Sequence, residues 1–221
     1  MKFRASQLGK LMTSSRTKGE ALSQTAKSYI IQKAKEDFYG YKNELTNKYV
    51  LKGIEQEQDS IDLLNLVRVE QWTKNDKRVE NEWLTGCCDI VTDFCIIDIK
   101  SSWSLDTFPS TTYELKDLND YEWQGRAYMW LYDMPCFELC YVMVSTHPEL
   151  LSQFDPYDIH EVDHIAPEKR ITSITFQRDK ELEIQMAERL IEATAFYKEV
   201  FSHHGFYIPV VMFDGCHNNV L

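Results

Sequence analysis

The N-terminal part of the chain carries apolar residues at helical spacing. This pattern predicts a short helix over residues 5–12, a helix over 22–38 with Ser23 as its N-cap, and a longer helix over 46–66. The longest helix would bury one apolar stripe, formed by Val50, Ile54, Ile61 and Leu64. The chain is therefore expected to begin as a set of amphipathic helices.

Beyond residue 66 the apolar pattern changes to that of strands. Strands are predicted at residues 67–72, 77–82, 84–91, 94–100, 137–145 and 171–177, with a tight turn at Thr92-Asp93. Helices are predicted at 113–132 and 179–203, and residues 206–221 are expected to form a loop or an edge strand. This order predicts one α/β (or α+β) domain over residues 1–221, in which a central mixed sheet is flanked by helices.

The composition is that of an ordinary globular protein. No apolar run approaches the roughly 20 residues that span a bilayer, and the N-terminus has no apolar signal core. We therefore expect a cytoplasmic protein that makes no contact with a membrane. The cysteines fit reduced thiols in a core rather than a metal cluster: Cys87, Cys88, Cys95, Cys136, Cys140 and Cys216.

Charge is distributed unevenly along the chain. The net charge of −11 disfavours contact with nucleic acid, because phosphates bind Lys and Arg. Residues 1–52, however, carry 11 Lys/Arg against 4 Asp/Glu, whereas residues 53–221 carry 13 against 31. A basic N-terminal helical segment on an acidic body is the result, and this segment is the expected place for contact with DNA.

Residues 86–100 contain the main candidate residues for a catalytic site. Along a strand over 94–100 the side chains alternate, so Asp98 and Lys100 share one face at its end. A hairpin at Thr92-Asp93 would bring Asp89 beside them. Carboxylates can hold Mg²⁺, which lowers the pKa of a bound water, and a lysine can orient that water or stabilise charge on a phosphate. The group fits phosphodiester hydrolysis, although Asp-x-Lys taken alone fits a surface ion pair better.

Two features elsewhere in the chain fit the same site. Glu57 follows Gly53 in the predicted helix, at a position where its carboxylate can face the apolar side, and a bound metal would explain a carboxylate there. Gln124 and Tyr128 are four residues apart and share one face of a later helix. Taken singly, each feature also fits ordinary packing at the edge of a core.

The order of these motifs resembles the PD-(D/E)XK nuclease superfamily. The four motifs are Gly-x-x-x-Glu ending at Glu57, Gly-x-x-Asp ending at Asp89, Asp-x-Lys ending at Lys100 and Gln-x-x-x-Tyr ending at Tyr128. Within the superfamily, residues 3–132 are similar to the RecB-like and phage lambda-exonuclease-type (YqaJ-like viral recombinase) branch. The resemblance implies a restriction-endonuclease-like core. The chain departs from that branch at Cys87-Cys88, where Ser-Pro is usual, and at Asp98, where Glu is frequent.

The resemblance also implies roles for individual residues. The metal ligands would be Glu57, Asp89, Asp98 and the backbone carbonyl of Ile99, with Mg²⁺ as the ion and Mn²⁺ as a substitute. Lys100 would be the catalytic lysine, and Gln124 and Tyr128 would position the site and the DNA strand. Arg4 and Ser6 would contact the 5′-phosphate, because Arg4-Ala5-Ser6 resembles the N-terminal Ala-Ser segment that lies near that phosphate in phage exonucleases.

The activity implied by the resemblance is exonucleolytic degradation of linear double-stranded DNA, from a 5′-phosphate in the 5′→3′ direction. It would serve phage-type recombination or DNA end processing. The partners would be DNA ends and a phage single-strand annealing protein, and the subunits would form a trimeric ring. The alternative is a catalytically inert DNA-binding or assembly protein that keeps the nuclease fold.

A competing motif lies at residues 160–164. His160-Glu161-x-x-His164 matches the His-Glu-x-x-His pattern in which two histidines one helical turn apart bind zinc and the glutamate activates water. Pro156 and Pro167 bracket the motif and leave little room for the long helix that this chemistry needs. A zinc metallopeptidase is therefore the weaker alternative.

Overall fold

The strands of the protein form two mixed sheets. The computed structural model describes residues 1–42 and 47–205. In the smaller sheet the order is β1 (Phe3–Arg4), β3 (Leu84–Gly86) and β2 (Val79–Glu80), with β1 parallel and β2 antiparallel to β3. In the larger sheet the order is β4 (Ile90–Val91), β5 (Ile96–Ser101), β6 (Cys136–Val142) and β7 (Ile171–Gln177). Only β5 and β6 are parallel there. The mixed α/β class is confirmed, with its strands divided between two sheets.

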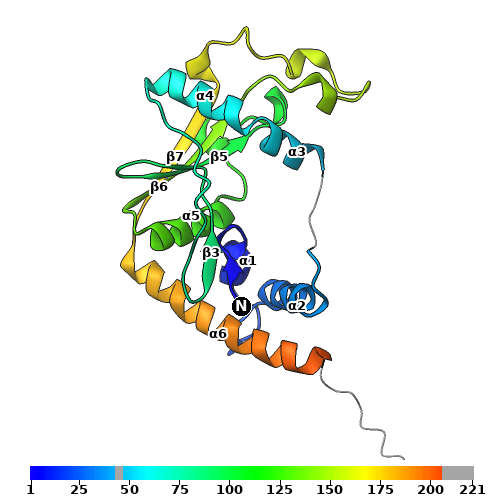
Figure 1. The fold of residues 1–221 in the computed structure, drawn as a ribbon, viewed down its shortest axis with the longest axis vertical. Coiled ribbons are helices and arrows are strands. Elements are labelled where there is room, and N and C mark those ends of the chain that lie inside the picture. The colour runs from blue at the N-terminus through cyan, green and yellow to red at the C-terminus, as the bar shows by residue number, and fades with distance from the viewer. Residues whose placement is uncertain (43–46, 206–221) are drawn as a thin grey trace, which may run out of the picture.

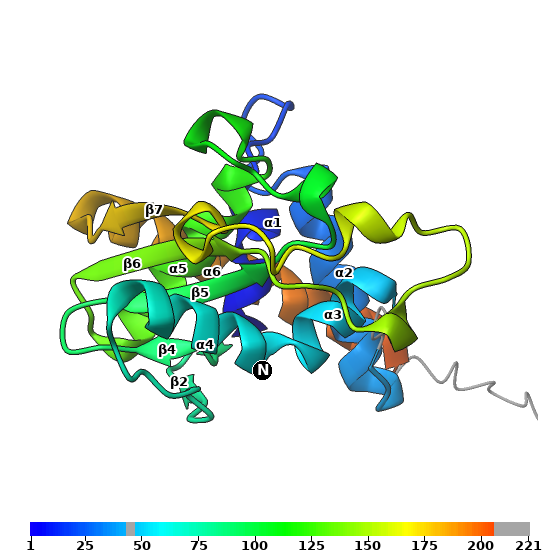
Figure 2. The ribbon, with the colours of Figure 1, turned by 90° about the horizontal axis from the view of Figure 1, so that it is seen from above.

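Helices surround both sheets (Figures 1 and 2). Their bounds are α1 Leu8–Met12, α2 Gln24–Tyr39, α3 Lys48–Glu55, α4 Glu57–Arg68, α5 Leu118–Tyr132 and α6 Lys180–Gly205. Helix α6 packs against α1 and α2, while α5 contacts both β3 and β6. Helix α4 lies against β5 and β6 at the far end of the molecule from α6 (Figure 1).

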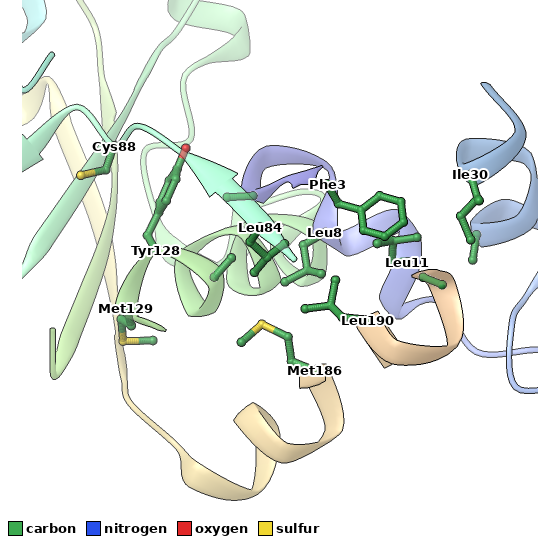
Figure 3. Packing of buried hydrophobic residues seen from close by; sticks show 14 of the residues in the cluster. Phe3, Leu8, Leu11, Ile30, Leu84, Cys88, Tyr128, Met129, Met186 and Leu190 are labelled. Carbon is green, nitrogen blue, oxygen red and sulfur yellow. The ribbon is translucent and has the colours of Figure 1, made fainter. Parts of the chain in front are cut away.

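The two faces of the larger sheet enter two different hydrophobic clusters, as the alternation of strand side chains requires. Ile96 packs in the cluster shared with α1, α5 and α6, whereas Ile97 and Ile99 pack with α4. Figure 3 shows the first cluster, in which Leu8 and Leu84 lie above Met186 and Leu190 of α6. The N-terminal segment is therefore an integral part of the main core.

Helix α5 approaches the sheet closely because it carries a glycine there. A Cβ on Gly125 would lie 1.9 Å from Cδ1 of the Phe137 ring. Phe137 is fully buried on β6, so it has no space into which it can move. The glycine therefore fixes the distance between α5 and the sheet, and with it the depth at which Gln124 enters the interior.

The helix predicted over 46–66 is two helices. Helix α3 ends at Glu55, and Gln56 adopts a non-helical φ of −111° before α4 begins. The Gln56 side chain is buried, donates to the Ser145 carbonyl oxygen at 2.6 Å and accepts from the His147 N–H at 3.1 Å. These bonds to a distant loop hold the break, so Val50 and Ile54 are exposed instead of continuing the buried stripe of Ile61 and Leu64.

Several strand predictions were too long. Residues 67–72 contain no strand, because α4 continues to Arg68 and Val69 ends it in the left-handed conformation, with φ of 58°. The prediction at 77–82 reduces to β2. The run 84–91 is divided between β3 and β4, which belong to different sheets. A continuous apolar run in the sequence therefore does not correspond to a continuous strand here.

The cap of α2 and the bounds of β7 agree with their predictions, whereas α5 begins late. Ser23 caps α2 by accepting from the Ala26 N–H at 3.0 Å, and β7 has the predicted bounds. Helix α5 begins at Leu118, five residues later than predicted. Among the described residues no helix has the length and hydropathy to cross a membrane. The prediction for residues 206–221, and Cys216 with it, lies outside the described residues.

Candidate functional site

The β4–β5 hairpin brings Asp89 next to Asp98, as the sequence predicted. Ile90 pairs with Ile97 in the antiparallel ladder, so Asp89 and Asp98 occupy facing positions just beyond it. The Thr92 hydroxyl closes the turn by bonding the backbone of Cys95 at 2.9 Å in both directions. Past the last ladder pair, the Asp89 carboxylate accepts from the Ile99 N–H at 2.5 Å. A backbone donor therefore fixes the position of this carboxylate.

Asp98 and Lys100 form an ion pair on one face of β5. Asp98 is 3% exposed, so its carboxylate lies below the surface at the end of the strand. The Lys100 side chain is partly exposed, and its ammonium group lies 5.1 Å from the centre of the Tyr121 ring on α5. The ammonium group is thus held between a carboxylate and an aromatic face.

Gln124 and Tyr128 connect α5 to the same carboxylate. Gln124 donates through Nε2 to Asp98 Oδ1 and lies within 3.1 Å of the Tyr128 hydroxyl as well. The Tyr128 hydroxyl donates to the Cys87 carbonyl oxygen at 3.1 Å. The Tyr128 ring also explains the glycine of Gly-x-x-Asp, because a Cβ on Gly86 would lie 2.7 Å from Cε1 of that ring. Hydrogen bonds therefore connect Gln-x-x-x-Tyr to Asp98 of Asp-x-Lys and to Cys87 of Gly-x-x-Asp.

Glu57 is the first residue of α4 and forms an ion pair with Lys74 at 2.6 Å. The bond to Glu57 raises the pKa of Lys74, with a smaller contribution from the charge of Asp89. Burial raises the pKa of Asp89, with a smaller contribution from the charge of Glu57. Glu57 consequently belongs to the same electrostatic cluster as Asp89. The helix break at Gln56, rather than a continuous helix face, directs it there.

Burial and like charge shape the electrostatics of this cluster. Burial, followed by the charge of Asp98, raises the pKa of Asp89 to about 8. Burial lowers the pKa of Lys100, but the charges of Asp98 and Asp89 outweigh it, so the pKa lies above its usual value. Three carboxylates face two lysines, and a divalent cation would relieve the remaining repulsion. The donor set consists of hard oxygen ligands, the type that Mg²⁺ prefers.

A basic pocket adjoins the cluster on the side of Tyr128. We use this name for a pocket of about 550 Å³ whose cationic lining is Lys2, Arg4, Lys33, Lys42 and Arg78. Ser6, Gly86, Cys87 and Tyr128 complete its wall. Two of the lysines are also ion-paired, Lys2 with Glu80 and Lys33 with Asp37. The predicted residues Arg4 and Ser6 therefore lie beside the acidic cluster, together with much of the basic charge of the N-terminal segment.

A second group of possible metal ligands lies at the C-terminal end of α3. Ligand atoms of Glu55, His147 and Glu149 lie within 4.8 Å of one another, and His147 Nε2 is 3.0 Å from Asp59. Glu55 and Glu149 are exposed. This group is not connected to Asp98 by any of the bonds described above.

The zinc-peptidase interpretation of residues 160–164 is wrong. His160 ends the short 3-10 helix Tyr157–Ile159, and the following residues form turns, so no helix places the two histidines together. His160 is buried, with Nδ1 3.1 Å from the Trp103 carbonyl oxygen and 3.0 Å from Thr146 Oγ1. His164 is exposed. The motif serves packing of a loop.

The sequence motifs missed three participants. Lys74 lies in the loop after α4, where nothing in the local pattern pointed to the site. Tyr121 is three residues before Gln124 on α5, and this helical spacing is the signal that would have found it. The third is the Cys87 carbonyl, a backbone group that residue identity cannot predict.

The chain is similar in structure to solved exonucleases. The chain is 34% identical to a phage-related exonuclease from Haemophilus somnus 129PT, with a TM-score of 0.87 over 93% of this chain and 97% of that one. An alkaline exonuclease from Laribacter hongkongensis (LHK-Exo) is 14% identical, with a TM-score of 0.65 over 91% of this chain and 90% of that one. Its complex with dAMP is 15% identical over the same shares, with a TM-score of 0.66. No protein-family model and no curated protein matches the chain. The first identity, over nearly the whole of both chains, places this protein in the family of phage-related, lambda-exonuclease-like exonucleases.

Proposed function

We propose that the protein is a Mg²⁺-dependent exonuclease that degrades linear double-stranded DNA from a 5′-phosphorylated end. The observation that carries this proposal is the bonded set of Asp89, Asp98 and Lys100 beside a basic pocket. Exonuclease activity accords with the family, and the metal, the polarity and a role in phage recombination or end processing are parts of the proposal. Mn²⁺ is expected to substitute for Mg²⁺ because both accept octahedral oxygen ligands.

The proposed metal ligands are Glu57, Asp89, Asp98 and the Ile99 carbonyl. Support for the carbonyl comes from strand geometry. The N–H and C=O of one strand residue point to the same side, and the Ile99 N–H points to Asp89. A bound Mg²⁺ would lower the pKa of a water and neutralise charge on the phosphate.

Chain residues would then do the positioning. Lys100, held beside Asp98, stays a cation and orients the attacking water toward phosphorus. Water oxygen forms a bond to phosphorus, the bond to the 3′ oxygen of the first nucleotide breaks, and that oxygen takes up a proton. Gln124 keeps the Asp98 carboxylate in place through the step. The shortened strand carries a new 5′-phosphate, which suits a pocket that contains Arg4 and Ser6 for the next round.

Cleavage of a 5′-phosphorylated linear duplex in Mg²⁺ tests the proposal. Asp98→Asn and Lys100→Met should each lose at least about a hundredfold in rate, the order expected when electrostatic stabilisation of a transition state is removed. Matched controls are Asp93→Asn, an exposed aspartate of the same hairpin, and Lys198→Met, an exposed lysine of α6. DNA binding by wild type without cleavage in Mg²⁺ or Mn²⁺ would instead favour the inert DNA-binding alternative.

Assembly is a separate part of the proposal and rests on family resemblance. A trimeric ring would enclose the duplex, and a phage single-strand annealing protein would receive the exposed strand. Mass measurement by light scattering, combined with processivity on long duplexes, tests the ring. A monomer that digests processively would contradict it.

A further inference from the structure

An aromatic groove lies beside Lys100, next to the acidic cluster. This groove has a volume of about 450 Å³ and is lined mainly by Tyr49, Gly53, Lys100, Trp103, Tyr121 and Tyr141. Lys100 belongs both to the groove and to the ion pair with Asp98. The groove is therefore continuous with the proposed site of cleavage.

Buried hydrogen bonds hold Trp103, which forms one wall of the groove. The Trp103 carbonyl oxygen accepts from Lys52 Nζ at 3.2 Å and from the Thr146 hydroxyl at 2.9 Å, and Lys52 is itself 1% exposed. The Trp103 ring is buried and meets the Tyr49 ring edge-on at 5.5 Å between centres. Trp103 thus acts as a fixed support that holds Tyr49 in one orientation.

The space in front of this wall is open. Tyr49 is 56% exposed, unlike Trp103 at 7%. A Cβ added to Gly53, one turn after Tyr49 on α3, would have no atom of the described residues within 4 Å. A flat group can therefore lie against the exposed part of Tyr49 without displacing a side chain.

The charges around the groove bear on whether the base or the phosphate of a nucleotide binds there. The Lys48 ammonium group, which is paired with Asp155, lies 4.6 Å from the centre of the Trp103 ring, and Lys100 lines the groove. Tyr121 and Tyr141 also line a larger pocket of about 850 Å³, whose charged side chains are Asp106, Glu114, Lys116 and Asp117. This mostly acidic pocket disfavours phosphates, while a neutral base can stack on the aromatic groups.

We propose that the aromatic groove holds one base of the strand being cut, stacked on Tyr49. This inference rests on the proposed function. Tyr128 and Gln124 link the basic pocket to Asp98, and Lys100 links Asp98 to the groove. A strand whose 5′-phosphate lies in the basic pocket would therefore place its second base, on the far side of the scissile phosphate, in the groove.

Fluorescence of a substituted base tests the assignment directly. The probe is a 5′-phosphorylated duplex with 2-aminopurine at the second nucleotide, bound to the Asp98→Asn variant so that it stays uncut. We expect the emission to be quenched on binding and the quenching to be lost with Tyr49→Leu. It should persist with Tyr49→Phe, which keeps the ring, and with Tyr39→Leu, which removes an exposed tyrosine outside the groove.

Cleavage rates give a second measurement in the wild-type background. Tyr49→Leu should lower kcat/KM about tenfold, the order expected for one stacked base. An abasic second nucleotide should cause the same loss in wild type and no further loss in Tyr49→Leu. Unchanged quenching, or independent effects of the two changes, would overturn the groove assignment. If wild type does not cut at all, the proposed function fails, and the quenching measurement still decides on the groove.

Discussion

Gln124 donates a hydrogen bond to Asp98 Oδ1 at 3.1 Å from a buried position on α5. The bond joins the two halves of the site, because Asp98 comes from the sheet and Gln124 from the helix that covers it. Lys100 occupies the other oxygen of the same carboxylate. Asp98 is therefore oriented from both sides before any metal or DNA binds.

Gln124→Leu should weaken metal-dependent cleavage without unfolding the protein. Loss of a group that orients a metal ligand typically costs about 10–100-fold in metal affinity or activity. Tyr128→Phe should cost less, because it removes the bond to the Cys87 carbonyl and leaves the Gln124–Asp98 bond in place. Titration of cleavage rate with Mg²⁺ measures both. Equal effects of the two variants would show that the chain of bonds acts as one unit.

Metal removal should abolish cleavage, and Mg²⁺ or Mn²⁺ should restore it. Since Asp89, Asp98 and Glu57 repel one another, added Mg²⁺ should also raise the melting temperature of the folded protein. Asp89→Asn should reduce this thermal shift, whereas Asp93→Asn, an exposed change in the same hairpin, should leave it intact. An equal shift in all three proteins would place the bound ion elsewhere, for example at Glu55, His147 and Glu149.

A 5′-phosphate should accelerate cleavage by wild type over a 5′-hydroxyl end. Arg4→Ala should remove this preference, because the guanidinium lines the basic pocket and can pair with phosphate. Arg16→Ala removes an exposed arginine outside the pocket and should keep the preference. Comparison of the two rates for each variant isolates recognition of the end from general attraction to DNA, because general attraction affects both substrates alike.

Gly125→Ala should destabilise the fold. The added methyl group would overlap the buried Phe137 ring, and overpacking of a core typically costs about 1–3 kcal/mol. The free energy of unfolding, from denaturant titration, is the measurement. Gly53→Ala is the matched control, because its Cβ would enter open space within a helix and alanine favours helix there. If the two variants are equally stable, Gly125 does not set the approach of α5.

His160 should contribute a loss of stability in mild acid. Burial lowers the pKa of this imidazole, so the folded protein holds it neutral. As the pH drops below about 6.5, the unfolded chain takes up a proton there that the folded chain does not. The His160 contribution to the free energy of unfolding therefore decreases toward pH 5, while Asp89, whose pKa is raised, contributes in the opposite direction, and His160→Gln should remove the His160 contribution. His164→Gln changes an exposed histidine and should leave the pH dependence unaltered.

The sequence predicted those parts of the site that depend on local geometry. Alternation along one strand placed Asp98 beside Lys100, and helical spacing placed Gln124 beside Tyr128. Glu57 joined its predicted neighbours for a different reason, since the helix that carries it breaks at Gln56. That break depends on hydrogen bonds to Ser145 and His147, about 90 residues away in sequence, as their separations of 89 and 91 show. Local patterns carry no information on such contacts.

The division of the strands between two sheets could not be predicted for a similar reason. The run 84–91 is apolar or small apart from Asp89, but its first part pairs with the N-terminal strand β1 and its last part pairs with β5. Strand pairing over this distance is decided by tertiary packing, which overrides a continuous apolar pattern. Predicted boundaries for α5 also failed where Thr112–Glu114 formed a separate 3-10 turn.

The bond between the Asp89 carboxylate and the Ile99 N–H has a consequence for how the family can vary. The carboxylate accepts a backbone hydrogen bond directly beyond the last pair of the β4–β5 ladder, so the Asp89 side chain is held as firmly as the strands are. Its position therefore depends on strand register, which the turn at residues 92–95 helps to fix. A one-residue insertion that shifted this register would turn the Asp89 side chain to the other face of the hairpin, away from the Ile99 N–H.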